Sequence, residues 1–145
     1  SDFELMFPAT YIESIPERMN LYRELDNITN ERDLADFEQR LTDRFGAIPQ
    51  EGLELIQVVR LRWLAKEYGI EKLVLKNEKW IAYLVANPQS PYYKSNNFGK
   101  VLNYMAKYPR KCQLKENKDK RSVVITPVRS VMEAYNVMTT IAQGE

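Results

Sequence analysis

The sequence predicts an α+β fold, in which an N-terminal three-helix segment packs with a small antiparallel sheet of two β-hairpins plus two further helices. Three observations carry this prediction. Apolar residues follow the helical period as far as Gly69, and they alternate with polar residues after it. Two pairs of β-rich runs are each joined by a two-residue polar corner, which is typical of hairpins. We expect a single domain over residues 1–145, with a helical part at 1–69 and a β-rich part at 70–145.

The first two helices are delimited by proline and asparagine. FELMFP at residues 3–8 is predicted to be extended. Pro16 is predicted to lie in the first turn of a helix that runs to about Thr29, since the first turn tolerates a missing N–H. Asn30 is a good N-terminal cap, and it predicts a second helix over about 31–45.

The stretch LTDRFGAIPQE at residues 41–51 connects the second helix to the third. Gly46 stands just past the last periodic residue, where a helix C-terminus favours glycine. Pro49 stands where a new helix can begin, and apolar spacing carries that helix to about Tyr68. This third helix is apolar on most sides, which predicts a central position. The stretch is therefore a corner between helices, and nothing in it predicts a phosphate-binding loop.

The β-rich part begins after Gly69, which caps the third helix. Its predicted elements are strands at 70–77 and 79–85, a loop at 87–97, a helix at 98–108, strands at 111–117 and 120–126, and a helix from Pro127 to about Gln143. The apolar spacing also predicts which side chains face the core. These are Leu34, Phe37, Leu41 and Phe45, then Leu53, Ile56, Val59 and Trp63, then Val101, Leu102, Met105 and Tyr108, and finally Val128, Val131, Met132, Tyr135 and Met138.

Composition excludes most catalytic chemistry. The chain has no histidine and a single cysteine, Cys112, so Ser-His and Cys-His pairs, histidine-held metals and internal disulfides are all absent. Its five glycines form no nucleotide-binding motif. We predict no catalytic residue, no cofactor and no metal site, and we read Cys112 as a small packed side chain. No apolar run is long enough to span a membrane, and no signal peptide opens the chain. The single cysteine suits a reducing cytoplasm, and the start at Ser1 without an initiator Met predicts a fragment of a larger protein.

Charge is distributed unequally along the chain. Residues 1–54 carry a net charge of −8, whereas residues 55–145 carry +9. Such asymmetry predicts charged partners, although solvated helix faces would produce the same pattern. The basic half permits an alternative function, an accessory nucleic-acid-binding domain, because Tyr92 and Tyr93 adjoin Lys94 and further cations follow at 107–121. Lysines that protect strand edges against aggregation explain the same residues, and we favour that explanation over direct DNA binding.

The second helix carries an outward acidic stripe. If Leu34 and Leu41 face the core, then Asp33, Asp36, Arg40 and Asp43 point the opposite way, at 100° per residue. Such a stripe could be solvated, or it could dock on a basic surface, where charge pairs set register and partner choice. Asp43 could also pair locally with Arg40 or Arg44.

The sequence resembles the C-terminal domain of bacterial transcription-repair coupling factors, the Mfd family. The segments that carry the resemblance are RMNLYREL at 18–25, LTDRFGAIP at 41–49 and LRWLAKEYGIEKL at 61–73. The similarity extends over nearly the whole chain and is densest in the helical part. The resemblance implies a non-catalytic regulatory domain of an ATP-driven DNA translocase, one that acts on stalled RNA polymerase and recruits the excision-repair protein UvrA.

The resemblance also implies a partner and a surface. In the family, the C-terminal domain packs against a UvrB-like N-terminal module of the same polypeptide, masks the surface that UvrA would use, and is released when RNA polymerase is engaged. Acidic residues near the end of the helix before the DRFG turn belong to that interface, and Asp43 matches them. One turn earlier this chain has Arg40 where an acidic residue would fit, and Asp36 is the residue expected to compensate.

Overall fold

The structure is a computed structural model that describes residues 5–144. The order of elements is three helices followed by β-β-α-β-β-α, as predicted, with an additional short 3₁₀ helix. The chain divides into two compact units, one ending at Arg60 and the other beginning at Leu61. We call them the helical unit and the β-rich unit. The boundary falls inside the third helix, α3 (Gln50–Glu67), whose two ends belong to different units.

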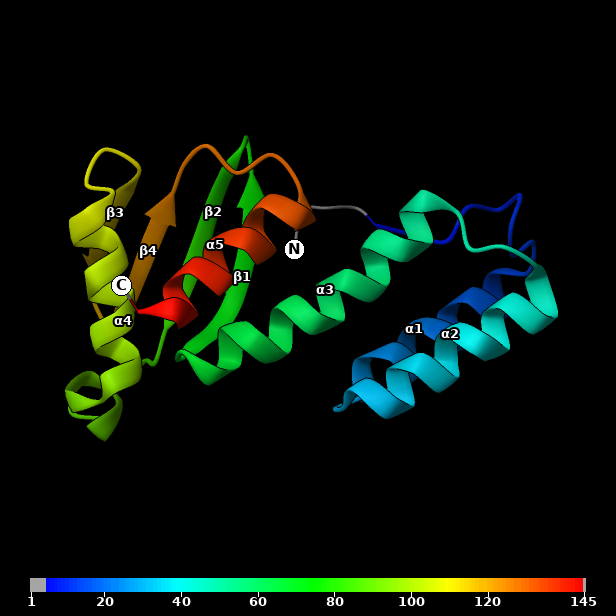
Figure 1. Cartoon of the computed structure of the whole chain (residues 1–145), viewed down its shortest axis with the longest axis horizontal. Coiled ribbons are helices and arrows are strands. Elements are labelled where there is room, and N and C mark those ends of the chain that lie inside the picture. Colours follow the sequence, from blue (N-terminus) through cyan, green and yellow to red (C-terminus); the bar gives the residue numbers. More distant parts are fainter. Residues whose placement is uncertain (1–4, 145) are drawn as a thin grey trace. The chain divides into compact units, whose positions relative to one another are not determined.

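The helical unit contains α1 (Ile15–Asn27) and α2 (Glu31–Phe45) (Figure 1). Both helices have side-chain caps, because Ser14 accepts from the Glu17 N–H and Asn30 accepts from the Asp33 N–H at 2.8 Å. The predicted apolar face of α2 is confirmed: Leu34, Phe37 and Leu41 are buried, although Phe45 is only half-buried. The two helices therefore pack through one face of α2 and leave the other to solvent.

An aromatic contact holds the segment before α1 onto the helices. The ring of Phe7 stacks on Tyr22 with centroids 5.5 Å apart, and the Phe7 N–H donates to the Tyr22 hydroxyl at 2.9 Å. The Tyr11 hydroxyl donates to the carbonyl of Gly46 at 2.8 Å, which fixes the corner after α2. Gly46 has a positive φ of 87°, as a glycine cap predicts. Residues 5–8, part of the predicted extended segment, belong to no strand, and residues 3 and 4 lie outside the described residues.

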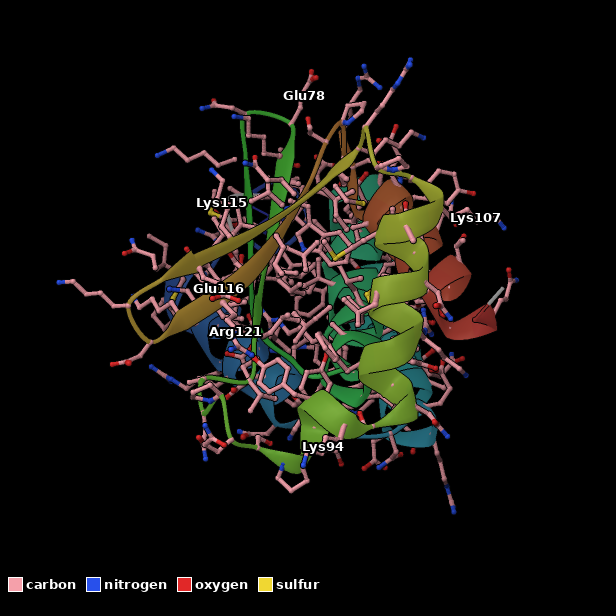
Figure 2. The ribbon with its side chains drawn as sticks, turned by 90° about the vertical axis from the view of Figure 1, so that its left-hand side faces the viewer. Glu78, Lys94, Lys107, Lys115, Glu116 and Arg121 are labelled. Carbon is pink, nitrogen blue, oxygen red and sulfur yellow. The ribbon has the colours of Figure 1, made fainter. Side chains whose placement is uncertain are left out.

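The β-rich unit is built on one antiparallel sheet with strand order β1-β2-β4-β3. The strands are β1 (Ile70–Lys76), β2 (Lys79–Leu84), β3 (Cys112–Asn117) and β4 (Lys120–Ile125). Helices α4 (Asn96–Lys107) and α5 (Val131–Gln143) lie on the same face of this sheet in both views (Figures 1 and 2). Both predicted hairpins are present, with turns at Asn77-Glu78 and Lys118-Asp119.

Serine caps move two helix starts away from the predicted positions. The predicted loop at 87–97 contains the 3₁₀ helix η1 (Pro91–Lys94) and the start of α4, which Ser95 caps. The final helix begins at Val131 and not at Pro127, because the Ser130 hydroxyl accepts from the Glu133 N–H. Its Glu133 carboxylate in turn accepts from the Arg129 N–H, close to the reciprocal arrangement of a capping box.

Three residues predicted to face the core are instead exposed. They are Leu53, Leu102 and Met132, with exposed fractions of 45%, 41% and 55%. Each stands one position after a buried residue, at Gly52, Val101 and Val131, so each points about 100° away from the packed face. When a helix has many apolar residues, its sequence does not determine which face is buried, because that depends on the elements that pack against it.

Candidate docking surface

The acidic stripe predicted on α2 lies on the exposed face of that helix. Asp33, Asp36, Arg40 and Asp43 are all exposed, opposite the buried Leu34 and Leu41. From Asp33 to Asp43 the helix rises about 15 Å, at about 1.5 Å per residue. The four side chains therefore extend over nearly three turns of one helix, on a surface that belongs to the helical unit alone.

Arg40 is held against α1 and does not pair with the stripe's own carboxylates. Its guanidinium forms an ion pair with Glu24 of α1, and it also lies over the Phe37 ring, 5.7 Å from the centroid. The hydrogen bond to Glu24 raises the pKa of the Arg40 guanidinium, and the nearby Asp36 carboxylate adds to that shift. Arg40 is thus a bridge between α1 and α2, which gives it a local structural role.

Asp43 has a neutral neighbour. One of its carboxylate oxygens accepts a hydrogen bond from the Gln39 side-chain amide at 2.9 Å. Arg44, the adjacent cation, forms an ion pair with Glu17 of α1. Within residues 5–144, neither Arg40 nor Arg44 forms an ion pair with Asp43, so the negative charge of Asp43 is not compensated locally.

Two shallow grooves meet at Arg40. The acidic groove, about 450 Å³, lies between α1 and α2 and is lined by Glu24, Asn27, Ile28, Asp33, Asp36 and Arg40. The apolar groove, about 280 Å³, is lined by Leu21, Phe37, Arg40, Leu41, Asp43, Arg44 and Phe45. The stripe is therefore one border of a broader surface. A basic side chain could enter the acidic groove while an apolar one covers the rim of Phe45.

Sequence reasoning missed the contribution of α1. Glu24 and Glu17 supply the carboxylates that hold Arg40 and Arg44, and Asn27 and Ile28 form one wall of the acidic groove. Glu24 and Arg40 are 16 residues apart. The helical period alone could not show which outward residues of α1 and α2 would meet, because that depends on how the two helices pack.

The β-rich unit uses its aromatic residues for internal packing. The rings of Tyr92 and Tyr93 lie 5.3 and 4.9 Å from the Phe98 ring, centroid to centroid. The Tyr92 hydroxyl donates to the Tyr68 carbonyl at 2.6 Å, the Tyr93 hydroxyl donates to a backbone carbonyl, and burial raises the pKa of Tyr92. Arg121 covers the Tyr93 ring at 4.6 Å from its centroid. These rings are not open platforms on which bases could stack.

Several cations of the β-rich unit share the β3–β4 hairpin, and others lie on separate elements. Figure 2 shows Lys94 on η1, Lys107 on α4 and Lys115 on β3, at different places on the surface. Arg121 also lies 3.5 Å from a carboxylate oxygen of Glu116, so part of the positive charge is compensated. This arrangement gives less support to the nucleic-acid alternative than the sequence pattern suggested.

Other chemistry finds little support in the described residues. Across residues 5–144, no three acidic or cysteine side chains are grouped so that they could hold a metal ion. Cys112 is half-buried, and burial raises the pKa of its thiol, which makes the reactive thiolate scarcer near neutral pH. In the described part of the chain, none of the helices combines the length and apolar character needed to cross a bilayer.

Comparisons with known proteins agree on one group. A sequence model of the TRCF domain family matches residues 1–95. The transcription-repair-coupling factor of Rickettsia prowazekii is 24% identical over 113 residues, which are 78% of this chain and 10% of that protein. That of Escherichia coli is 31% identical over 68 residues, or 47% of this chain and 6% of that protein. The chain thus spans about a tenth or less of these relatives.

A solved structure shares the fold. It is described as the crystal structure of the C-terminal domain of transcription-repair coupling factor, and it superposes with a TM-score of 0.70. The match covers 99% of this chain and 90% of the other, at 14% sequence identity. At that identity the likeness speaks for the arrangement of helices and strands and not for any particular surface.

Proposed function

Because this chain belongs to the TRCF domain family, we propose that it is a non-catalytic regulatory domain of a transcription-repair coupling factor. In this proposal residues 1–145 act as one domain of a larger multidomain protein in the cytoplasm. The domain docks on the UvrB-like module of the same polypeptide and masks the surface that UvrA would bind. Engagement of RNA polymerase separates the two and exposes that surface.

The observation that carries the proposal is the uncompensated charge of the α2 stripe. Arg40 and Arg44 are both engaged by carboxylates of α1, whereas Asp43 has only an amide partner. A surface with surplus carboxylates beside an apolar groove fits a basic partner that also presents apolar side chains. Asp36 and Asp43 are the docking residues of the proposal, Asp33 extends the surface, and Arg40 shapes it.

Tethering makes a weak interface sufficient. Two modules of one polypeptide meet at an effective concentration up to about the millimolar range, so a modest polar interface stays mostly closed. A partner that binds only the separated state shifts the population towards it by its differential affinity for the two states. Release on polymerase engagement therefore needs no chemistry in this domain.

Binding of the isolated chain to a purified UvrB-like module tests the proposal. We expect measurable binding that UvrA competes away, because both would occupy one surface. Asp43→Ala should weaken binding by roughly 2–5 kcal/mol if the carboxylate is desolvated in the complex. Its effect on folding should be small, since an exposed carboxylate without an ion pair contributes little.

Glu13→Ala is the matched control. Glu13 is exposed in the same unit, and only its backbone carbonyl is engaged, so the substitution removes one negative charge without touching α2. Equal weakening by both variants would mean that net charge and not the stripe drives binding. Unchanged binding in Asp43→Ala would leave the stripe a solvated face. Salt-sensitive binding of DNA by the β-rich unit would favour the nucleic-acid alternative.

A further inference from the structure

Strand β3 is an uncovered edge of the sheet. It pairs with β4 on one side only, and every residue after Cys112 is exposed. Leu114, in its middle, is 40% exposed although it is apolar. In Figure 2 no helix passes in front of β3, on which Lys115 is labelled. An exposed strand edge presents a row of backbone groups that a further strand could use.

Alternate residues of β3 point their backbone N–H and C=O groups towards β4 or away from it, and the second set is available to a further strand. The Thr126 N–H donates to the Lys111 carbonyl at 3.0 Å, and β3 continues antiparallel to β4 in regular register from there. Backbone groups of an antiparallel strand alternate in direction, so Gln113 and Lys115 also bond towards β4. Those of Cys112, Leu114 and Glu116 point away from β4, and among residues 5–144 they have no backbone partner on that side.

The opposite edge of the sheet, strand β1, is less regular at one end. The register of β1 against β2 shifts between Ile70 and Lys72, a β-bulge or similar irregularity, and there the Glu71 carboxylate accepts a hydrogen bond from the Ala86 N–H at 3.0 Å. Bulges are one means by which proteins hinder edge pairing. The β3 edge has a regular register along its whole length. The two edges therefore differ in their readiness to accept another strand.

Charge determines which strand would be accepted. The β3–β4 hairpin at 111–121 carries a net charge of +3. Lys115 lies beside the outward backbone groups, and within residues 5–144 it forms no ion pair. A second copy of this chain would bring another +3 hairpin alongside, which disfavours pairing between identical edges. The aromatic rings that could have favoured a nucleic acid are packed among themselves.

We propose that the β3 edge binds an extended acidic segment of a partner protein as a fifth strand of the sheet. Outward backbone groups of Cys112, Leu114 and Glu116 supply the main-chain hydrogen bonds, and Leu114 offers an apolar contact for alternate side chains of the incoming strand. Lys115 and the turn lysine Lys118 select for carboxylates. This surface belongs to the β-rich unit and is independent of the acidic groove on the helical unit.

A synthetic peptide tests the proposal with the full chain. The probe is a capped peptide of about ten residues in which valine and glutamate alternate, long enough to pair with all six residues of β3. We expect NMR amide shifts confined to β3 and its neighbours on β4, with the largest changes at Leu114 and Glu116. A peptide with lysine in place of glutamate should produce no such shifts, and a thymidine oligonucleotide of similar length should bind more weakly than the acidic peptide.

Two variants, the second with a matched control, test the mechanism. Leu114→Pro removes an outward N–H and keeps the ladder to β4, and it should weaken binding by roughly tenfold. Lys115→Glu should weaken it several-fold, whereas Lys76→Glu, the same charge change on the opposite edge strand, should not. Unaltered binding in both β3 variants, no β3 shifts at millimolar peptide, or preference for the oligonucleotide would each overturn the proposal.

Discussion

The two units differ in how their elements are held together. In the helical unit, arginines reach across to carboxylates on neighbouring helices: Arg40 to Glu24, Arg44 to Glu17, and Arg60 to Glu31 at 3.0 Å. Both units also pack aromatic rings, but the rings of Tyr92, Tyr93 and Phe98 in the β-rich unit lie closer together, at 4.9–5.3 Å, than those of Phe7, Tyr11 and Tyr22 in the helical unit, at 5.5–6.3 Å. Each cross-helix pair has at least one exposed partner and contributes little, whereas closely packed aromatic rings are hard to replace. The helical unit should therefore tolerate changes to its surface better than the β-rich unit.

Gly69→Ala should produce the largest loss of stability, and it falls in the β-rich unit. Gly69 has a positive φ of 82°, and an added Cβ would lie 2.2 Å from the Tyr92 ring, inside the aromatic cluster. Strain and overpacking together should cost about 2–4 kcal/mol of unfolding free energy. Gly99→Ala is the control, because Gly99 lies in α4 with nothing within 4 Å of the added atom. Denaturant unfolding should show loss for the first and a gain of about 0.5–1 kcal/mol for the second.

Alkaline pH should weaken the β-rich unit through Tyr104. Burial raises the pKa of Tyr104 from 10.0 to about 12. A group whose folded pKa is raised gives stability that is complete below the unfolded value and is lost as pH rises towards the folded one. The window is therefore pH 10 to 12, with a contribution of roughly 2 kcal/mol. Tyr104→Phe should flatten the fall of stability across this window, and an unchanged slope would contradict the assignment to Tyr104.

Glu78→Gly should stabilise the β1–β2 turn. Asn77 and Glu78 both have positive φ, at 51° and 62°, and glutamate is poorly suited to that conformation. Its side chain contributes only an exposed ion pair with Arg129, 3.6 Å away. Relief of the strain should raise the unfolding free energy by about 1 kcal/mol, less the small value of that pair. Glu78→Ala, which loses the same pair and keeps the strain, should not stabilise.

Arg40→Ala should have the smallest effect on folding. Its pair with Glu24 is exposed on both sides, so the loss should stay within about 1 kcal/mol in a melting experiment. The same change leaves Glu24 without its cation and adds to the negative charge of the acidic groove. Binding to a basic partner should therefore tighten slightly. Weaker binding would show that the partner needs the guanidinium itself, and Arg40 would then be a direct docking residue.

The fold was largely predictable because its local signals agree. Gly46, Asn30 and the two hairpin corners stand where a cap or turn requires them, and the predicted α+β order is confirmed. The sequence-based predictions were wrong where one pattern was compatible with more than one helix start or buried face. Pro127 suggested a helix start, but the Ser130 cap begins α5 four residues later. Leu102 and Met132 are apolar neighbours of the true buried face, and only packing distinguishes them.

The sequence predicted which side chains of α2 point outward, but not the groove that they border. The outward direction of Asp33, Asp36, Arg40 and Asp43 follows from the buried stripe of α2, and all four are exposed. The groove they border depends on α1, which meets α2 through contacts between residues distant in sequence. Whether this surface docks a partner stays a prediction.

The division of cations between the units also has a practical side. Up to Arg60 every basic side chain is an arginine, and the first lysine of the chain is Lys66. Reagents that join lysine to lysine can therefore attach only to side chains from Lys66 onwards, such as Lys115. None of the side chains that line the acidic groove can react with them. Carbodiimide coupling, which joins a carboxylate directly to a partner's amine, would capture a contact at that groove and identify its face by mass spectrometry.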